Sequence, residues 1–106
     1  MAALSNDRSA PTPVILAIDT SSTVTGLCVL QNGAVVKSVN ETFDEKRSEQ
    51  LWFALDGLLR DAGLALGDVD LIAVCVGPGG FTGLRVGVAA AKGLAVAGNK
   101  PMVGVT

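Results

Sequence analysis

The chain has 106 residues, of which 49% are hydrophobic and 17% are charged, and its formal net charge is −2. This length suits one small domain, and the weak negative charge without a basic run argues against autonomous nucleic-acid binding. Histidine is absent, which excludes Ser-His-Asp and Cys-His catalysis and the usual zinc sites. Because the chain is so apolar, we expect some of its apolar surface to meet a partner or another domain.

The N-terminal residues 1–13 are polar, contain prolines and lack the apolar core of a secretion signal. We expect a disordered leader or a cloning remnant there. No uncharged stretch approaches the ~18 apolar residues of a membrane-spanning helix, so we expect a cytoplasmic protein without a membrane segment. Cys28 and Cys75 lie in separate apolar runs. They are typical of buried free thiols in a reducing compartment, with a disulfide as the minor alternative.

Three strands are predicted at the start of the folded region. Residues 14–18 are continuously apolar, as in a fully buried strand. Residues 25–30 and 34–39 are the second and third strands. Asn32-Gly33 between them predicts a hairpin, because both positions tolerate positive φ.

A helix, a strand, a second helix and a last strand are predicted next. Asp44 is the expected N-cap of the first helix and Gly63 its stop. Residues 71–76 form the fourth strand, the second helix runs to about Ala97, and residues 102–105 form the fifth strand. The apolar stripe of the first helix comprises Leu51, Trp52, Leu55, Leu58, Leu59 and Ala62.

The element order is therefore βββαβαβ, which predicts an α/β fold. Right-handed crossovers would place the later strands parallel to the first, in a five-stranded mixed sheet with helices packed on it. The chain stops at Thr106, directly after a strand. We expect residues 14–106 to be one lobe of a longer protein whose second lobe is absent.

A glycine-rich loop joins the fourth strand to the second helix. Its candidate functional residues are Gly77, Gly79, Gly80, Thr82, Gly83 and Arg85. In α/β proteins such a loop binds phosphate or packs a helix closely. A P-loop would need lysine where Leu84 stands, and a dinucleotide loop would need glycine at Thr82. Close helix packing and a role at an interface both stay open. We expect Gly79 or Gly80 to require the absence of a β-carbon or a positive φ.

The element order βββαβαβ and two motifs resemble the bacterial TsaB (YeaZ) family. The motifs are residues 15–21, Ile-Leu-Ala-Ile-Asp-Thr-Ser, and residues 77–87, Gly-Pro-Gly-Gly-Phe-Thr-Gly-Leu-Arg-Val-Gly. The resemblance covers residues 14–106. It implies an N-terminal lobe of the actin-like/sugar-kinase/Hsp70 (ribonuclease H-like) fold.

The same resemblance implies a part in making N6-threonylcarbamoyladenosine (t6A) on tRNA. The chain would belong to a non-catalytic scaffold beside the catalytic TsaD-like subunit and the TsaE-like ATPase. It would meet tRNA only indirectly, and a homodimer is compatible with the resemblance. Two alternatives stay open: an ATP-binding enzyme of the same superfold, and a glycoprotease-like peptidase homologue.

The chain departs from the family at the start of the first helix. Family members often carry histidine before Ser or Thr there, whereas Arg47 precedes Ser48 in this chain. The histidine pair through which the related catalytic subunit holds a metal is absent too. We therefore assign no catalytic residue and no metal ligand, and we expect neither metal chemistry nor proteolysis.

A degenerate phosphate loop is the first candidate site, formed by Asp19, Thr20, Ser21 and Ser22. Its backbone N–H groups and hydroxyls would cradle phosphate, and its carboxylate would hold hydrated Mg²⁺. The same residues would equally satisfy an ordinary turn. Because a phosphate clamp in this fold needs both lobes, we expect no cofactor in this lobe alone and ATP or ADP only in the assembled complex.

A partner interface is the second candidate site. Phe53 and Gly57 lie off the apolar stripe of the first helix, while Gly83, Gly87 and Ala91 form a smooth ridge on the second. Small residues let another helix approach closely, although the ridge would equally suit packing on the sheet. The resemblance favours docking, because family members pair through these two helices with the catalytic subunit or with themselves.

Overall fold

The computed structural model describes residues 13–42 and 47–106. Its elements are β2 (Val14–Asp19), β3 (Val24–Gln31), β4 (Ala34–Thr42), α1 (Arg47–Asp61), the 3₁₀ turn η1 (Leu66–Asp68), β5 (Leu71–Cys75), α2 (Phe81–Gly98) and β6 (Met102–Val105). The predicted order βββαβαβ is confirmed. The predicted leader, apart from Pro13, and the predicted N-cap Asp44 lie outside the described residues.

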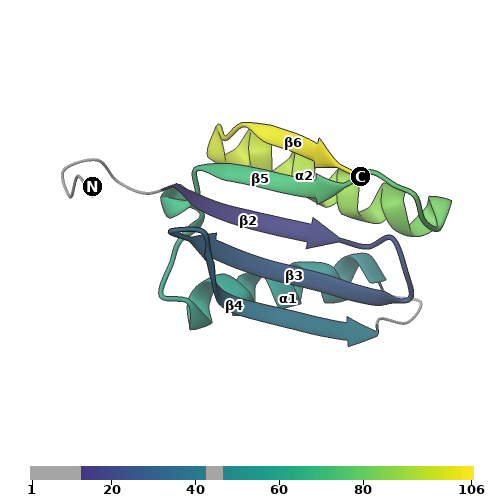
Figure 1. Ribbon diagram of the computed structural model, residues 1–106, viewed down its shortest axis with the longest axis horizontal. Helices are drawn as coiled ribbons and strands as arrows, with labels where there is room; N and C mark the ends of the chain where they lie inside the picture. Colours follow the sequence, from purple (N-terminus) through teal and green to yellow (C-terminus); the bar gives the residue numbers. More distant parts are fainter. Residues whose placement is uncertain (1–12, 43–46) are drawn as a thin grey trace.

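The strands form one five-stranded mixed sheet in the order β4-β3-β2-β5-β6 (Figure 1). β2 and β3, like β3 and β4, are antiparallel, whereas β5 runs parallel to both β2 and β6. The expected parallel pairing of the later strands with the first is therefore confirmed. The carboxyl ends of β2, β5 and β6 meet at one edge of the sheet, which is where α/β sheets place their ligand sites.

The Asn32-Gly33 hairpin is confirmed, with φ of 60° at Asn32 and 73° at Gly33. Positive φ at both central residues gives a turn whose twist matches that of the flanking strands. The strand pairing continues from this turn as far as Val24 and Thr42, apart from an irregularity between Val29 and Leu30. Both strands are therefore longer than their apolar residues indicate.

Both helices pack on the same face of the sheet (Figure 1). The predicted leucines of α1 are buried there: Leu51, Leu55, Leu58 and Leu59. Gly63 has a φ of 73° just past the end of α1 and confirms the predicted stop. The prediction that Trp52 belongs to the apolar stripe needs correction. Trp52 is 45% exposed and lies at the edge of the stripe rather than in the core.

The core lies between the helices and the inner face of the sheet. Its buried residues are Val14, Leu16, Ile18, Leu27, Val29, Leu51, Leu55, Leu58, Leu59, Val69, Ile72, Val74, Ala90, Ala91 and Leu94. Thr20 and Thr25 are buried with them, and the Thr25 hydroxyl has no hydrogen-bond partner among the described residues. No helix in the described part of the chain combines the length and apolarity needed to span a membrane.

Candidate functional site

Two loops meet where β2 and β5 end. The turn after β2 carries the predicted phosphate-loop residues, and the glycine loop follows β5. The backbone N–H of Gly80 donates to the carbonyl oxygen of Ser21 at 2.9 Å. Adjacent parallel strands end at the same edge of a sheet, so their following loops become neighbours. The structure therefore brings together the two motifs on which the family resemblance depends.

The carboxylate of Asp19 is held by its own turn. It accepts hydrogen bonds from the Ser21 backbone N–H at 2.9 Å and from the Ser21 hydroxyl at 2.5 Å. The hydroxyl and then the backbone N–H of Ser21 lower the pKa of Asp19. Burial opposes them by a smaller amount, and the Cys75 thiol adds a still smaller lowering. Asp19 therefore stays charged near neutral pH, at an exposed position beside the glycine loop.

The hydroxyl of Thr20 joins the end of β2 to the first turn of α2. Thr20 is fully buried, and its Oγ1 donates to the carbonyl oxygen of Gly83 at 2.5 Å. A β-carbon on Gly87 would lie 2.3 Å from the same Oγ1 atom. Thr20 therefore serves as a packing contact between strand and helix, and its burial keeps it from an approaching ligand.

The prediction of a docking ridge on α2 needs correction. Gly83 and Gly87 are buried and Ala91 is 0% exposed. The contact between Gly87 and Thr20 shows that the ridge faces the sheet of this same lobe. The small residues let α2 lie close to the end of β2, so the expectation that they are free for a partner helix is wrong.

Close approach also explains one glycine of the loop. A β-carbon on Gly79 would lie 2.5 Å from the carbonyl oxygen of Ser21, a distance that real structures do not show. A β-carbon on Gly80 would be 3.8 Å from the same Ser21 oxygen, which is an ordinary contact. The expectation that at least one of the two glycines leaves no room for a β-carbon is confirmed at Gly79. Gly77 has a φ of 138°, a backbone conformation that residues with a side chain rarely adopt.

The polar side chains of the turn after β2 are hydrogen-bonded within the chain. The hydroxyls of Ser21 and Ser22 donate to Asp19 and to the Val24 carbonyl respectively. Thr82 and Arg85 are exposed on the first turns of α2. Among the described residues, no group of three or more His, Cys, Asp or Glu is placed to hold a metal ion. The arrangement therefore stabilises a tight loop pair around one charged carboxylate.

The outer face of α1 is a second, separate surface. Phe53 is 79% exposed, and one turn later Gly57 has open space where a β-carbon would be. Beside them, α1 and β4 enclose a groove of about 440 Å³. Glu41 and Asp61 line this groove together with the half-buried Val39. The predicted positions of Phe53 and Gly57 away from the core are therefore confirmed, and the groove beside them has an acidic rim.

Sequence reasoning missed the part of this groove that comes from β4. Val39, Glu41 and Thr42 line it, although the third strand was expected to end at Val39. The predicted hairpin could have indicated the full length of β4. Counting pairs outward from Asn32-Gly33 extends β4 alongside β3 and brings Glu41 opposite Thr25.

Trp52 lies between the two helices. A β-carbon on Gly93 of α2 would be 3.6 Å from the indole ring, so the ring packs beside that glycine, which itself stays exposed. Trp52 also lines a shallow groove of about 360 Å³, whose other members include Leu55, Leu66 and Leu94. This contact explains why a residue at the edge of the apolar stripe is only half exposed.

Comparison with known proteins agrees with these motifs. The family model for TsaD, tRNA N6-adenosine threonylcarbamoyltransferase, matches residues 7–106. The TsaB protein of Escherichia coli, a tRNA threonylcarbamoyladenosine biosynthesis protein, is 34% identical over 87% of this chain and 39% of its own length. The tRNA N6-adenosine threonylcarbamoyltransferase of Thermodesulfovibrio yellowstonii is 37% identical over 87% of this chain and 32% of its own length.

Solved structures give the same result. YeaZ from Pseudomonas aeruginosa superposes with a TM-score of 0.81 at 35% identity, covering 89% of this chain and 44% of YeaZ. The nuclease domain of the Sf6 virus terminase has a TM-score of 0.58 at 17% identity, covering 91% of this chain and 38% of its own, and shows a shared fold alone. The chain spans less than half the length of these relatives. It belongs to the TsaD family, and the resemblance to the TsaB (YeaZ) proteins that its motifs predicted is confirmed.

Proposed function

We propose that this chain is part of a non-catalytic scaffold subunit in t6A modification of tRNA, where it binds and supports a TsaD-like catalytic subunit. The observation that carries the proposal is the outer face of α1, where Phe53 is 79% exposed next to Gly57. An aromatic side chain beside a glycine offers a partner both an anchor and close access to the helix backbone. The names of the relatives place the family in t6A biosynthesis.

The chemistry of the docking face indicates what the partner should present. Phe53 and Val39 offer apolar contact, while Glu41 and Asp61 give the groove an acidic rim. Complementarity then calls for an apolar helix flanked by lysine or arginine on the TsaD-like protein. A second copy of this chain would bring the same acidic rim to the contact, which makes a homodimer through this groove less favourable.

The loop pair around Asp19 supports an accessory role rather than an enzymatic one. Its hydroxyls are hydrogen-bonded within the chain, and the sequence contains no histidine to act as a base. In this proposal, ATP or ADP is bound only in the assembled complex, where a TsaE-like ATPase takes part. The complex works in the cytoplasm and meets tRNA through its other subunits.

Binding to the TsaD-like protein of the source organism tests the proposal. Phe53→Asp places a charge in the apolar contact, so we expect a loss of about 2 kcal/mol, or roughly 30-fold in Kd, by isothermal titration calorimetry. Val96→Asp is the matched control, because Val96 is 83% exposed on the other helix. Unchanged binding by folded Phe53→Asp protein would contradict the docking face.

The alternative, an ATP-binding enzyme, has the charged Asp19 beside a glycine loop in its favour. It predicts that the chain turns over ATP in the presence of Mg²⁺ and that Asp19→Ala abolishes this turnover. The scaffold proposal predicts no turnover in the same assay with either protein. Turnover that depends on Asp19 would overturn the scaffold proposal.

A further inference from the structure

The outer edge of β4 has no strand beside it among the described residues, because β4 is the outermost strand of the sheet (Figure 1). α1 lies over β3 and β4 alike, on the inner face of the sheet rather than along its edge. Every residue of β4 is exposed except the half-buried Val39. An edge strand of this kind presents a row of unpaired backbone N–H and C=O groups, which another chain can pair with.

The second half of β4 is the part that is regular enough to pair along its length. The register with β3 is irregular near Val36, which has no partner on that strand. An extra residue of this kind bends a strand locally. From Lys37 to Thr42 the pairing with β3 runs without interruption. A further strand on the outer edge would therefore pair with residues 37–42.

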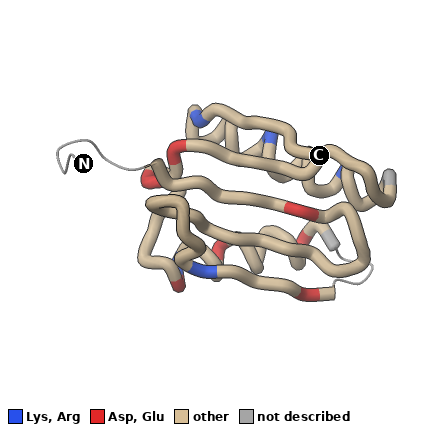
Figure 2. The backbone as a smooth tube through the Cα atoms, in the orientation of Figure 1, with Lys and Arg blue, Asp and Glu red and all other residues tan. Residues whose placement is uncertain are grey.

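This half of β4 carries one basic and one acidic residue, Lys37 and Glu41 (Figure 2). Both are exposed, and among the described residues neither forms a salt bridge. They lie on the same face of the strand as Val39, which packs against the core. Four residues span about 13 Å along a strand, so the two charges are too far apart to pair with each other. Each is therefore available to a charge on another chain.

We propose that β4 pairs edge to edge with β4 of a second copy of this chain, in an antiparallel register centred on Val39. Lys37 of each copy then lies opposite Glu41 of the other, and the two Val39 side chains lie opposite each other between these charge pairs. Opposite charges and apolar pairs directly across two strands are favourable. The contact is the same from both sides, as a two-fold symmetric dimer requires. It would join the two sheets into one.

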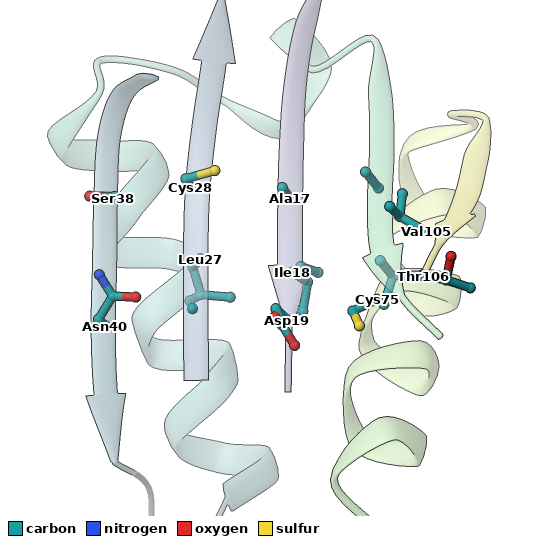
Figure 3. A pocket seen from close by; sticks show the side chains of 13 residues that line it. Ala17, Ile18, Asp19, Leu27, Cys28, Ser38, Asn40, Cys75, Val105 and Thr106 are labelled. Atoms are coloured by element: carbon teal, nitrogen blue, oxygen red, sulfur yellow. The ribbon is translucent and has the colours of Figure 1, made fainter. Parts of the chain in front are cut away.

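The outer side of this pairing is complementary as well. Ser38 and Asn40 lie on the face opposite the helices, where both line a hollow of about 450 Å³ (Figure 3). In the register centred on Val39, Ser38 of one copy lies opposite Asn40 of the other, and a hydroxyl and an amide can hydrogen-bond to each other. Moving the centre by one residue would place Lys37 or Glu41 opposite Val39. The register centred on Val39 is therefore the one that pairs both charges.

This inference concerns the strand edge and does not rest on the docking role of α1. A second copy seated in the groove beside α1 would bring its own acidic rim to the contact. Along the strand edge, by contrast, the second copy brings Lys37 to Glu41. The edge contact is tested by reversing these two charges, whereas the docking role is tested by changing Phe53.

Reversing the two charges separately provides the test, and sedimentation velocity over a range of concentrations provides the measurement. Lys37→Glu makes both positions acidic and Glu41→Lys makes both basic, so both charge pairs become repulsive in either variant. We expect self-association of each variant to weaken roughly tenfold or more. When the two variants are mixed they should associate again, because each acidic edge then meets a basic one. The double variant Lys37→Glu/Glu41→Lys should dimerise like the parent.

Lys92→Glu and Glu49→Lys are the matched controls, since they make the same changes of charge at exposed positions on α2 and α1. Both should dimerise like the parent, alone and when mixed. Circular dichroism checks that every variant is folded. Carbodiimide coupling of the parent should join Lys37 of one copy to Glu41 of the other in a covalent dimer, which mass spectrometry identifies.

Three results would overturn the proposal. The first is a parent chain that stays monomeric at every concentration. In that case, association of Lys37→Val would show that Lys37 protects the edge against pairing, as lysine does on many edge strands. The second is a parent dimer that neither charge reversal weakens, which would assign the contact to another surface. The third is a mixture of Lys37→Glu and Glu41→Lys that does not associate, which would exclude the register centred on Val39.

Discussion

The two helices pack on the same face of the sheet, yet they use their small residues in opposite ways. On α2, Gly87 faces inward and touches Thr20, so its small size lets the helix approach the strand. On α1, Gly57 faces outward into open space beside the exposed Phe53. Leucines fill the space beneath α1, and small residues bring α2 close to the sheet. A glycine in a helix therefore marks close approach only where something lies on its own side.

The largest effect is expected from alanine at the two contrasted glycines. Gly87→Ala would place a β-carbon 2.3 Å from Thr20 Oγ1 and should cost about 1–3 kcal/mol through overpacking. Gly57→Ala meets no atom within 4 Å and should stabilise the helix by up to about 1 kcal/mol. Urea unfolding measures both. Equal stability of the two variants would contradict the contrast between the helices.

A smaller effect is expected in the loop before α2, where the same contrast separates neighbouring residues. Gly79→Ala would bring a β-carbon 2.5 Å from the Ser21 carbonyl oxygen and should cost about 1–2 kcal/mol, since an exposed loop relieves part of the clash. Gly80→Ala is the control, with a normal φ of −62° and a change within about 0.5 kcal/mol. If Gly79→Ala unfolds at the parent's urea midpoint, the two loops are not in close contact.

The smallest effect concerns pH. Because the folded-state pKa of Asp19 is below its ordinary value of 3.8, the charged carboxylate stabilises the turn above that pH, and this contribution is lost as pH falls through the folded-state pKa. Asp19→Asn should therefore be slightly less stable than the parent near neutral pH and approach the parent as the pH falls below the ordinary carboxyl value of 3.8 and through the folded-state pKa. Unfolding midpoints of both proteins across this range provide the measurement. A difference that grows toward acid pH would have the wrong sign.

Local patterns predicted most of the elements correctly. The apolar runs, the Asn32-Gly33 turn and the Gly63 stop each depend on a residue's own backbone preference or on a short repeat. The sequence predicted only that Gly79 or Gly80 would need a positive φ or leave no room for a β-carbon. It did not indicate which of the two, because the neighbour that decides this, Ser21, is 58 residues away from Gly79 in the chain. The sequence thus named the residues of the two loops, whereas the contacts between the loops came from the structure alone.

The sequence by itself determined the strands, the helices, their order and the family, because periodicity, turn residues and motifs are local or additive along the chain. Tertiary structure alone decided that the α2 ridge faces inward, that Trp52 packs beside Gly93, and that Ala17, Cys28 and Ala73 share the sheet face opposite the two helices. Helical spacing places residues on one side of a helix but does not say which side meets the sheet. That choice depends on the space between helix and strand, which is set by the packing of segments far apart in the chain.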